Sequence, residues 1–72
     1  MYAPKIRLQL AQKLKDERRK AKLTQEKVAE IIEVSVRYYQ ILESKNPSAI
    51  KIDLLDRIAK AFKIKPAQLL DF

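Results

Sequence analysis

The sequence lacks three residue types on which much protein chemistry depends. It contains no cysteine and no histidine, so it has neither a thiol nor an imidazole nucleophile, no histidine base and no zinc site of the cysteine–histidine kind. It also contains no glycine, which excludes a glycine-rich loop that cradles phosphate groups. No set of Asp and Glu residues has the spacing of a Mg²⁺ or Ca²⁺ site. We therefore expect no enzyme, no cofactor and no bound metal.

Long apolar runs are also missing. No segment approaches the roughly 20 apolar residues that cross a membrane, and the first ten residues lack the apolar stretch of a secretory signal. A chain of 72 residues with 47% hydrophobic composition is long enough for one modest core, without a disulfide to stabilise it. We expect a single domain over residues 1–72, located in the cytoplasm.

Charge is present in excess of one sign. The chain has 16 Lys and Arg residues against 9 Asp and Glu residues, which gives a net charge of +7. A field of this sign attracts polyanions, nucleic acid first and an anionic membrane surface second. The plainer interpretation is that the lysines only keep a small protein soluble, and charge alone leaves these alternatives open.

Apolar residues recur at helical spacing along nearly the whole chain, and the alternation of β-strands is absent, so the predicted fold is all-α. The first helix has Pro4 in its first turn. Its apolar stripe consists of Ile6, Leu10, Leu14 and Ala21. A fourth helix is marked by Ile52, Leu55, Ile58, Ala59 and Phe62, and a short last helix opens at Pro66 with Leu69 and Leu70.

Two hydroxyl residues predict the starts of the second and third helices. Thr24 and Ser35 each stand where a side-chain oxygen can cap the unpaired N–H groups of a following helix. The third helix is short because Asn46-Pro47 interrupts it. The predicted inward residues of these two helices are Val28, Ala29, Ile32, Tyr39 and Leu42.

The segment from Thr24 to Glu43 therefore has two short helices around a turn of about three residues, the geometry of a helix-turn-helix unit. With this unit in place, the chain resembles the lambda-repressor-like, Xre-type (Cro-type) helix-turn-helix domains, in an ordered set of features that runs from about Leu14 to Leu70. The matching features are Leu23-Thr24-Gln25-Glu26, Val28-Ala29-Glu30, Val34-Ser35, Leu42-Glu43, Asn46-Pro47, Ile58-Ala59-Lys60-Ala61-Phe62 and Leu69-Leu70.

The resemblance implies a compact bundle of about five short helices, whose third helix lies in the major groove of double-stranded DNA. It places Gln25 against a phosphate, Val36, Arg37, Gln40 and Ile41 toward the groove, and Tyr38 at their edge. The loop that follows the third helix is expected to touch phosphate. The implied DNA-binding residues are Gln25, Ser35, Val36, Arg37, Tyr38, Gln40, Ile41, Ser44, Lys45 and Asn46.

Some of these roles also follow from the residues themselves. A cation near a helix start opposes the helix dipole, so Arg37 indicates an anionic or guanine partner, with a merely solvated arginine as the alternative. Gln40 can donate and accept as adenine recognition requires, although an ordinary surface glutamine is nearly as plausible. Tyr38 is expected to be exposed, with its hydroxyl in reach of phosphate.

Glu43 requires a cation, because a carboxylate in the last turn of a helix opposes the dipole. In the family that it resembles, this position often pairs with an arginine of the first helix, which here corresponds to Arg18. We expect a structural ion pair between Arg18 and Glu43 that steadies the third helix. The alternative is an exposed pair that contributes roughly 0–1 kcal/mol.

The chain departs from the family at three positions that are commonly glycine there, Glu33, Lys45 and Lys63. A left-handed conformation costs an ordinary residue about 1–2 kcal/mol. The chain either accepts this strain or closes the helices differently, with Asn46 left-handed in place of Lys45. The predicted reading face is also unusually apolar, because Val36 and Ile41 can only contact thymine methyl groups or pack against protein.

The leading hypothesis is a sequence-specific DNA-binding transcriptional regulator, a repressor that binds as a homodimer and has no small-molecule ligand. Leu70 and Phe72 are the candidate dimer contacts, with closure of the core as their alternative role. The second hypothesis is a protein-interaction module, such as an antitoxin or adaptor on the same fold, that binds protein through Val36, Tyr38 and Ile41. A third is nonspecific binding of nucleic acid or membrane by charge alone.

Overall fold

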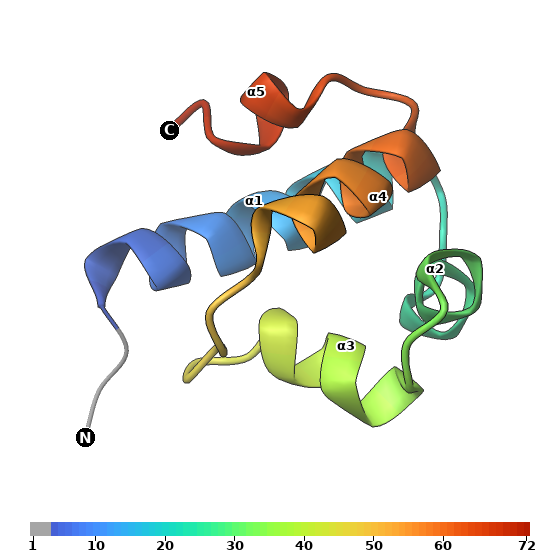
Figure 1. Cartoon of the computed structure of the whole chain (residues 1–72), viewed down its shortest axis with the longest axis horizontal. Helices are drawn as coiled ribbons and strands as arrows, with labels where there is room; N and C mark the ends of the chain where they lie inside the picture. Colours follow the sequence, from blue (N-terminus) through green and yellow to red (C-terminus); the bar gives the residue numbers. More distant parts are fainter. Residues whose placement is uncertain (1–3) are drawn as a thin grey trace.

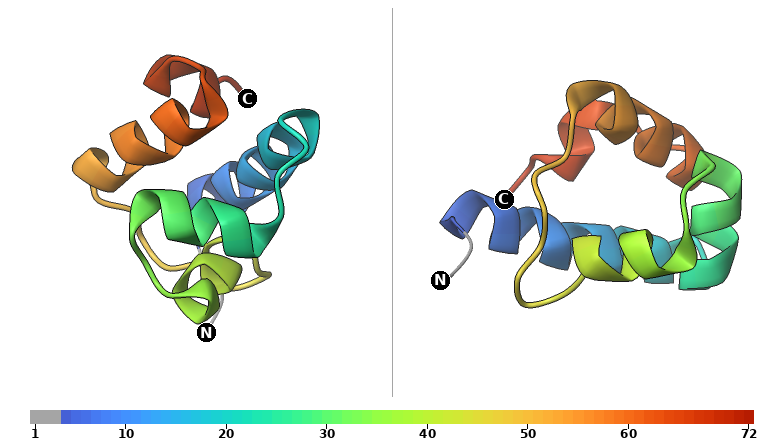
Figure 2. Two further views of the ribbon diagram at one scale, coloured as in Figure 1. Left: turned by 90° about the vertical axis from the view of Figure 1, so that its right-hand side faces the viewer. Right: turned by 60° about the horizontal axis from the view of Figure 1, so that its bottom comes forward.

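The computed structural model describes residues 4–72 and folds them into five helices. They are α1 (Lys5–Lys20), α2 (Gln25–Ile32), α3 (Val36–Leu42), α4 (Ile52–Phe62) and α5 (Pro66–Leu69), and no strand occurs within the described residues. The predicted all-α class is therefore confirmed. α2 packs against α3 and α4, and α5 packs against α4 and α1. Figures 1 and 2 show α3 and α5 on opposite sides of the molecule.

The core lies between the helices and contains the inward residues predicted for α2 and α3. Val28, Ala29, Ile32, Tyr39 and Leu42 are all buried. They pack together with the buried residues Leu14, Leu54, Leu55, Ile58, Ala59, Phe62 and Leu69. The apolar spacing of the sequence thus predicts most of this core.

The buried face of α1 differs from the predicted stripe. Ile6 and Ala21 are exposed, whereas Ala11 and Glu17 are buried beside Leu14. Four residues turn an α-helix through about 400°, so a stripe of period four rotates steadily away from any fixed face. Over the two steps from Leu14 back to Ile6 this rotation carries the side chain off the core.

The N-terminal caps of α2 and α3 form as predicted. The Thr24 hydroxyl oxygen accepts a 3.0 Å hydrogen bond from the backbone N–H of Lys27. The Ser35 hydroxyl oxygen accepts one of 3.0 Å from the backbone N–H of Tyr38. Each cap satisfies a helix N–H group that has no partner inside the helix.

Three helices end at a residue in the left-handed conformation, although the chain has no glycine to supply it. Glu33 and Lys63, two of the predicted strained positions, have φ of 62° and 60°, and Lys22, which the sequence did not reveal, has φ of 59°. Lys45 and Asn46 are not left-handed. There the Ser44 hydroxyl donates to the Ile41 carbonyl at 2.7 Å and accepts from the Asn46 N–H at 3.2 Å, so a side chain closes α3 instead.

Each left-handed residue is followed by an apolar residue that packs against the core. Leu23, Val34 and Ile64 are partly buried there, and their N–H groups donate to carbonyls five residues earlier, at 3.2, 3.0 and 3.0 Å. The left-handed residues themselves donate to carbonyls three residues earlier. These two hydrogen bonds at each helix end form the Schellman motif, which an apolar contact frequently accompanies. Burial of the apolar side chain offsets the strain of the residue before it.

The strain at Lys63 predicts opposite effects of two lysine-to-glycine changes, one just after α4 and one within it. Lys63→Gly relieves about 1–2 kcal/mol of strain but frees the unfolded chain by about 0.4–1 kcal/mol, so we expect the free energy of unfolding to rise slightly. Lys60→Gly, three residues earlier in right-handed helix, should lower it by about 1 kcal/mol. Urea denaturation of both variants measures the difference, and equal losses would show that Lys63 is unstrained.

Candidate nucleic-acid interface

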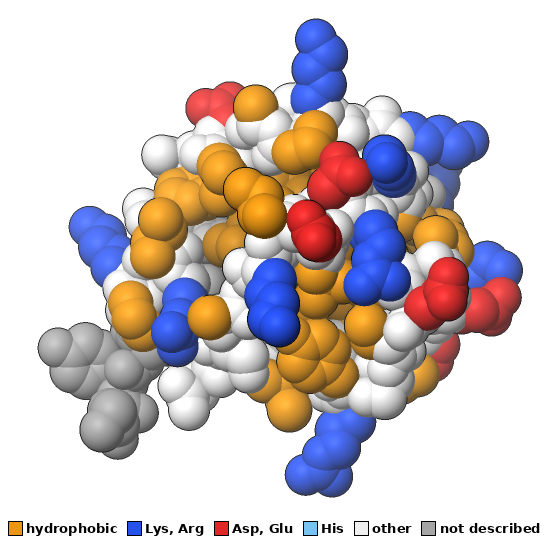
Figure 3. Space-filling model, in the orientation of Figure 1, with side chains coloured by type: hydrophobic (Ala, Val, Ile, Leu, Met, Phe, Trp, Pro, Cys, Tyr) orange, Lys and Arg blue, Asp and Glu red, His pale blue; other side chains and the backbone are white. Residues whose placement is uncertain are grey.

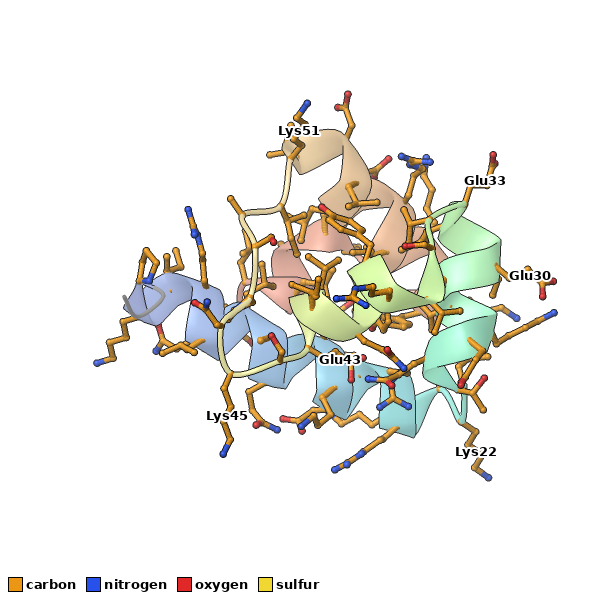
Figure 4. All side chains as sticks on the ribbon, turned by 90° about the horizontal axis from the view of Figure 1, so that it is seen from below. Lys22, Glu30, Glu33, Glu43, Lys45 and Lys51 are labelled. Atoms are coloured by element: carbon orange, nitrogen blue, oxygen red, sulfur yellow. The ribbon has the colours of Figure 1, made fainter. Side chains whose placement is uncertain are left out.

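One face of α3 is open to solvent. Arg37, Gln40 and Ile41 are exposed, whereas Tyr39, Leu42 and the following Glu43 are buried. The spacing i, i+3, i+4 places the three exposed side chains on one side of the helix. In Figure 4, which views the molecule from the α3 side, this helix lies in front of the rest of the fold.

Val36 and Tyr38 lie on the flanks of this exposed face. Both are only partly exposed and pack against the core, so the expectation that Val36 faces outward and Tyr38 is exposed is corrected. At 100° per residue, they lie at the two borders between the buried and exposed faces of α3. Tyr38 lines a groove of about 420 Å³ with Lys51 and Arg57 among its other walls. The exposed face is narrower and less apolar than the sequence predicts.

The loop after α3 presents the other predicted contacts to solvent. Ser44, Lys45 and Asn46 are exposed, and Pro47 is buried and anchors the loop. Figure 4 shows Lys45 pointing away from the body of the protein. The Ser44 hydroxyl already makes two hydrogen bonds within the loop, so it shapes the end of α3 and has no free proton to donate.

The charge of this region has one sign. Residues 34–52 include three cationic side chains, Arg37, Lys45 and Lys51, and all are exposed. The single carboxylate in this described segment is Glu43, which is buried. The surface formed by α3 and its loop is therefore positive, although Glu30 and Glu33 lie beside it on α2 and its turn (Figure 4).

Glu43 is the centre of a polar cluster that joins four segments. Arg18 of α1 donates to both carboxylate oxygens of Glu43, from Nε at 2.7 Å and from Nη2 at 3.1 Å. Its Nη1 donates to the Leu23 carbonyl at 2.9 Å, and Gln25 Nε2 donates to Glu43 Oε1 at 3.1 Å. The Glu43 side chain is 1% exposed and that of Arg18 is 13% exposed. The structure thus brings the two predicted partners together as a bidentate ion pair, in which Glu43 is buried and Arg18 is partly buried.

The cluster favours the ionised forms of both partners. Burial alone would raise the pKa of Glu43, but its interactions with Arg18, with the nearby Tyr39 hydroxyl and with Gln25 more than compensate, so its pKa lies below the usual value. The same hydrogen bond to Glu43 raises the pKa of Arg18. Burial, reinforced by the neighbouring Glu43 carboxylate, raises the pKa of the Tyr39 hydroxyl, which has no hydrogen-bond partner among residues 4–72.

Gln25 has a structural contact that the sequence did not reveal. The resemblance assigns its side chain to phosphate, but in the structure it is partly buried and its amide is bonded to Glu43. One amide hydrogen is therefore committed to the cluster. Gln25 fixes the start of α2 relative to the end of α3. Its amide oxygen and its second amide hydrogen are available to a ligand.

Arg57 braces the turn between α2 and α3, a role that the sequence did not reveal. Its Nη1 donates to the carbonyl of Ile32, the last residue of α2, at 3.0 Å. A cation at a helix C-terminus also interacts favourably with the helix dipole. An arginine 25 residues away in the chain gives no local signal of this contact.

Comparison with known families and structures identifies the chain as a helix-turn-helix protein. The helix-turn-helix family model matches residues 14–69. The structure is similar to the crystal structure of the clp gene regulator ClgR from C. glutamicum, with a TM-score of 0.86 and 26% identity over 94% of this chain and 86% of that chain. No curated protein matches the chain by sequence. Within residues 4–72, no helix is long and apolar enough to span a membrane.

The burial of the Arg18–Glu43 pair predicts a large loss of stability when it is broken. Glu43→Ala leaves the partly buried Arg18 without its partner, so the free energy of unfolding should fall by about 3–5 kcal/mol. Glu30→Ala, which breaks the exposed pair with Lys27, is the matched control and should cost roughly 0–1 kcal/mol. Thermal unfolding followed by circular dichroism compares them. Similar midpoints for the two variants would mean that the buried pair has no structural role.

Proposed function

The chain belongs to the lambda-repressor-like (Xre-type) helix-turn-helix family, and from this premise we propose that it is a sequence-specific transcriptional repressor. It binds double-stranded DNA as a homodimer, with α3 of each copy in the major groove. Membership of the family supports a DNA-binding regulator. Repression requires only that the bound dimer occupy its site.

The exposed face of α3 is the observation that carries the proposal. It presents Arg37, Gln40 and Ile41 on a segment whose one carboxylate is buried and neutralised. Arginine makes two hydrogen bonds to guanine, glutamine makes two to adenine, and an apolar side chain contacts the methyl group of thymine. Lys45 and Lys51 flank this face and supply charge for the phosphates on either side.

The packing of Val36 and Tyr38 disfavours the alternative of a protein-interaction module. That hypothesis requires an open apolar surface formed by Val36, Tyr38 and Ile41. Two of the three side chains pack against the core instead, which leaves Ile41 exposed among polar neighbours. Single exposed apolar residues are normal on protein surfaces and do not make a protein-binding patch.

The shape of the molecule suits a symmetric pair on DNA. Its longest dimension is 31 Å, and half-sites on one face of DNA repeat about every 34–36 Å. Two copies can therefore occupy neighbouring half-sites without overlapping.

An apolar groove near the C-terminus is the surface that we assign to the partner copy. Leu70 and Phe72 are 46% and 50% exposed, so neither closes the core, a task that the fully buried Leu69 performs. Leu70 lines a groove of about 260 Å³, whose other apolar walls include Ile6, Leu10, Ile50 and Leu55. Figure 3 shows hydrophobic side chains gathered on this side of the molecule, over the first turns of α1.

Selection of bound sites from a random DNA pool tests the function. Two variants distinguish a contact with a base from a contact with phosphate. The wild-type chain should recover one motif with two-fold symmetry. Arg37→Ala should relax the preference at one base position of each half-site and cost about 1–3 kcal/mol there, whereas Lys45→Ala should weaken all sequences alike. Affinity should also fall steeply with salt. A pool that yields no motif, or equal effects of both variants on selected and scrambled DNA, would contradict sequence-specific recognition.

The dimer makes a separate prediction about Leu70. Leu70→Glu places a charge in the groove, so it should abolish the dimer in sedimentation experiments and weaken binding to the full palindrome, while binding to an isolated half-site is unchanged. Ile52→Glu is the control, because Ile52 is the most exposed large apolar residue within residues 4–72 and lies outside that groove. If both variants remain dimeric, the groove is not the interface.

A further inference from the structure

We propose that Arg57, although it belongs to α4, is a positioning residue for DNA recognition. Through its hydrogen bond to the turn between α2 and α3, it holds the orientation of the reading face, which is the exposed side of α3 formed by Arg37, Gln40 and Ile41. The inference rests on the proposed function and adds to it a residue that acts on specificity without touching a base.

The C-terminal end of α2 carries charges of the wrong sign for a helix end. Glu30 lies in the last turn and Glu33 follows at the cap, and no basic residue lies in the last turn of this fully described helix. Negative charge at a helix C-terminus opposes the helix dipole. Arg57 supplies the missing cation from another helix, because its Nη1 lies 3.0 Å from the carbonyl oxygen of Ile32, the last residue of α2.

The same hydrogen bond satisfies a carbonyl that the turn itself leaves open. The last carbonyls of a helix have no partner within it. Backbone N–H groups of the turn donate to the carbonyls of Ala29 and Glu30, whereas the Ile32 carbonyl accepts from Arg57. Since the left-handed Glu33 persists only where its surroundings constrain it, loss of the Arg57 contact gives the turn freedom to relax.

A change in this turn is transmitted to the whole reading face. α3 begins at Val36, four residues after Ile32, and Arg57 lines the same groove as Tyr38 in the first turns of α3. Paired hydrogen bonds to a base, such as those of Arg37 to guanine, require a fixed geometry. Attraction to phosphates is independent of sequence. A looser turn should therefore lower discrimination between sequences and leave nonspecific affinity unchanged.

Arg57→Met tests the proposal, because it keeps an unbranched side chain but removes the charge and the donors. The Kd of each chain is measured for the selected palindrome and for scrambled DNA. The ratio of the two should fall by about tenfold per half-site, roughly the contribution of one hydrogen bond from a charged group. The preference should weaken at every base position that α3 reads, and the dependence of log Kd on log salt concentration should keep its slope.

Two further variants separate the contact from the charge. Lys60→Met removes the same charge from the next turn of α4 and should leave the ratio at its wild-type value. Arg57→Lys keeps a cation and a donor at the original position and should restore part of the ratio.

Amide hydrogen exchange locates the effect in the protein. The N–H of Val34 closes the end of α2, and the N–H of Leu23 closes the end of α1 in the same way. In Arg57→Met the Val34 amide should exchange faster, while the Leu23 amide keeps its wild-type rate. Faster exchange at both amides would indicate a general loss of stability and would overturn the positioning role.

Two results of the binding experiment would also overturn the proposal. One is an unchanged ratio in Arg57→Met, and the other is a salt slope reduced by about one, which would make Arg57 a phosphate contact. Either result leaves sequence-specific binding intact, because the wild-type chain still recovers its motif. If the wild-type chain recovers no motif, the proposed function fails and this inference fails with it.

Discussion

The buried carboxylate of Glu43 constrains the rest of the structure. A charge that is 1% exposed must be paired, and here its partners come from α1 and from the start of α2. Arg18 also bonds the Leu23 carbonyl, so the cluster fixes the connection between those two helices. α3 packs chiefly on α2, and the cluster adds a polar link to α1. The orientation of the reading face therefore depends on a hydrogen-bonded charge pair whose geometry is more specific than apolar contact.

The turn between α2 and α3 is fixed without glycine. Glu33 takes the left-handed conformation, Val34 buries its side chain, Ser35 caps α3, and Arg57 holds the Ile32 carbonyl. These contacts act on consecutive residues, so a shift at one position disturbs the next. The strain at Glu33 is tolerated because the residues around it leave the backbone little freedom to relax. A rigid turn of this kind reduces the ordering that α3 would otherwise undergo on binding a partner.

The sequence predicts the parts of the structure that local chemistry decides. Thr24 and Ser35 are recognisable caps, and the inward residues of α2 follow from helical spacing. Helical spacing places Val36 and Tyr38 at the borders of the buried face of α3, but it does not decide how far each is covered. For Tyr38, residues distant in the chain decide this, since Lys51 and Arg57 line the same groove. The Gln25 bond to Glu43 spans 18 residues and is likewise absent from any local pattern.

The narrowness of the reading face bears on the number of copies that must bind. A well-formed contact between a side chain and a base discriminates by about 1–3 kcal/mol, and α3 presents Arg37, Gln40 and Ile41 for such contacts. Binding to a specific site is typically about 4–10 kcal/mol tighter than binding to nonspecific DNA. The few contacts of one half-site hardly exceed this difference. Two copies on symmetric half-sites double the number of contacts. On the proposed function, dimerisation is therefore a condition for specificity in a protein that reads so few bases per copy.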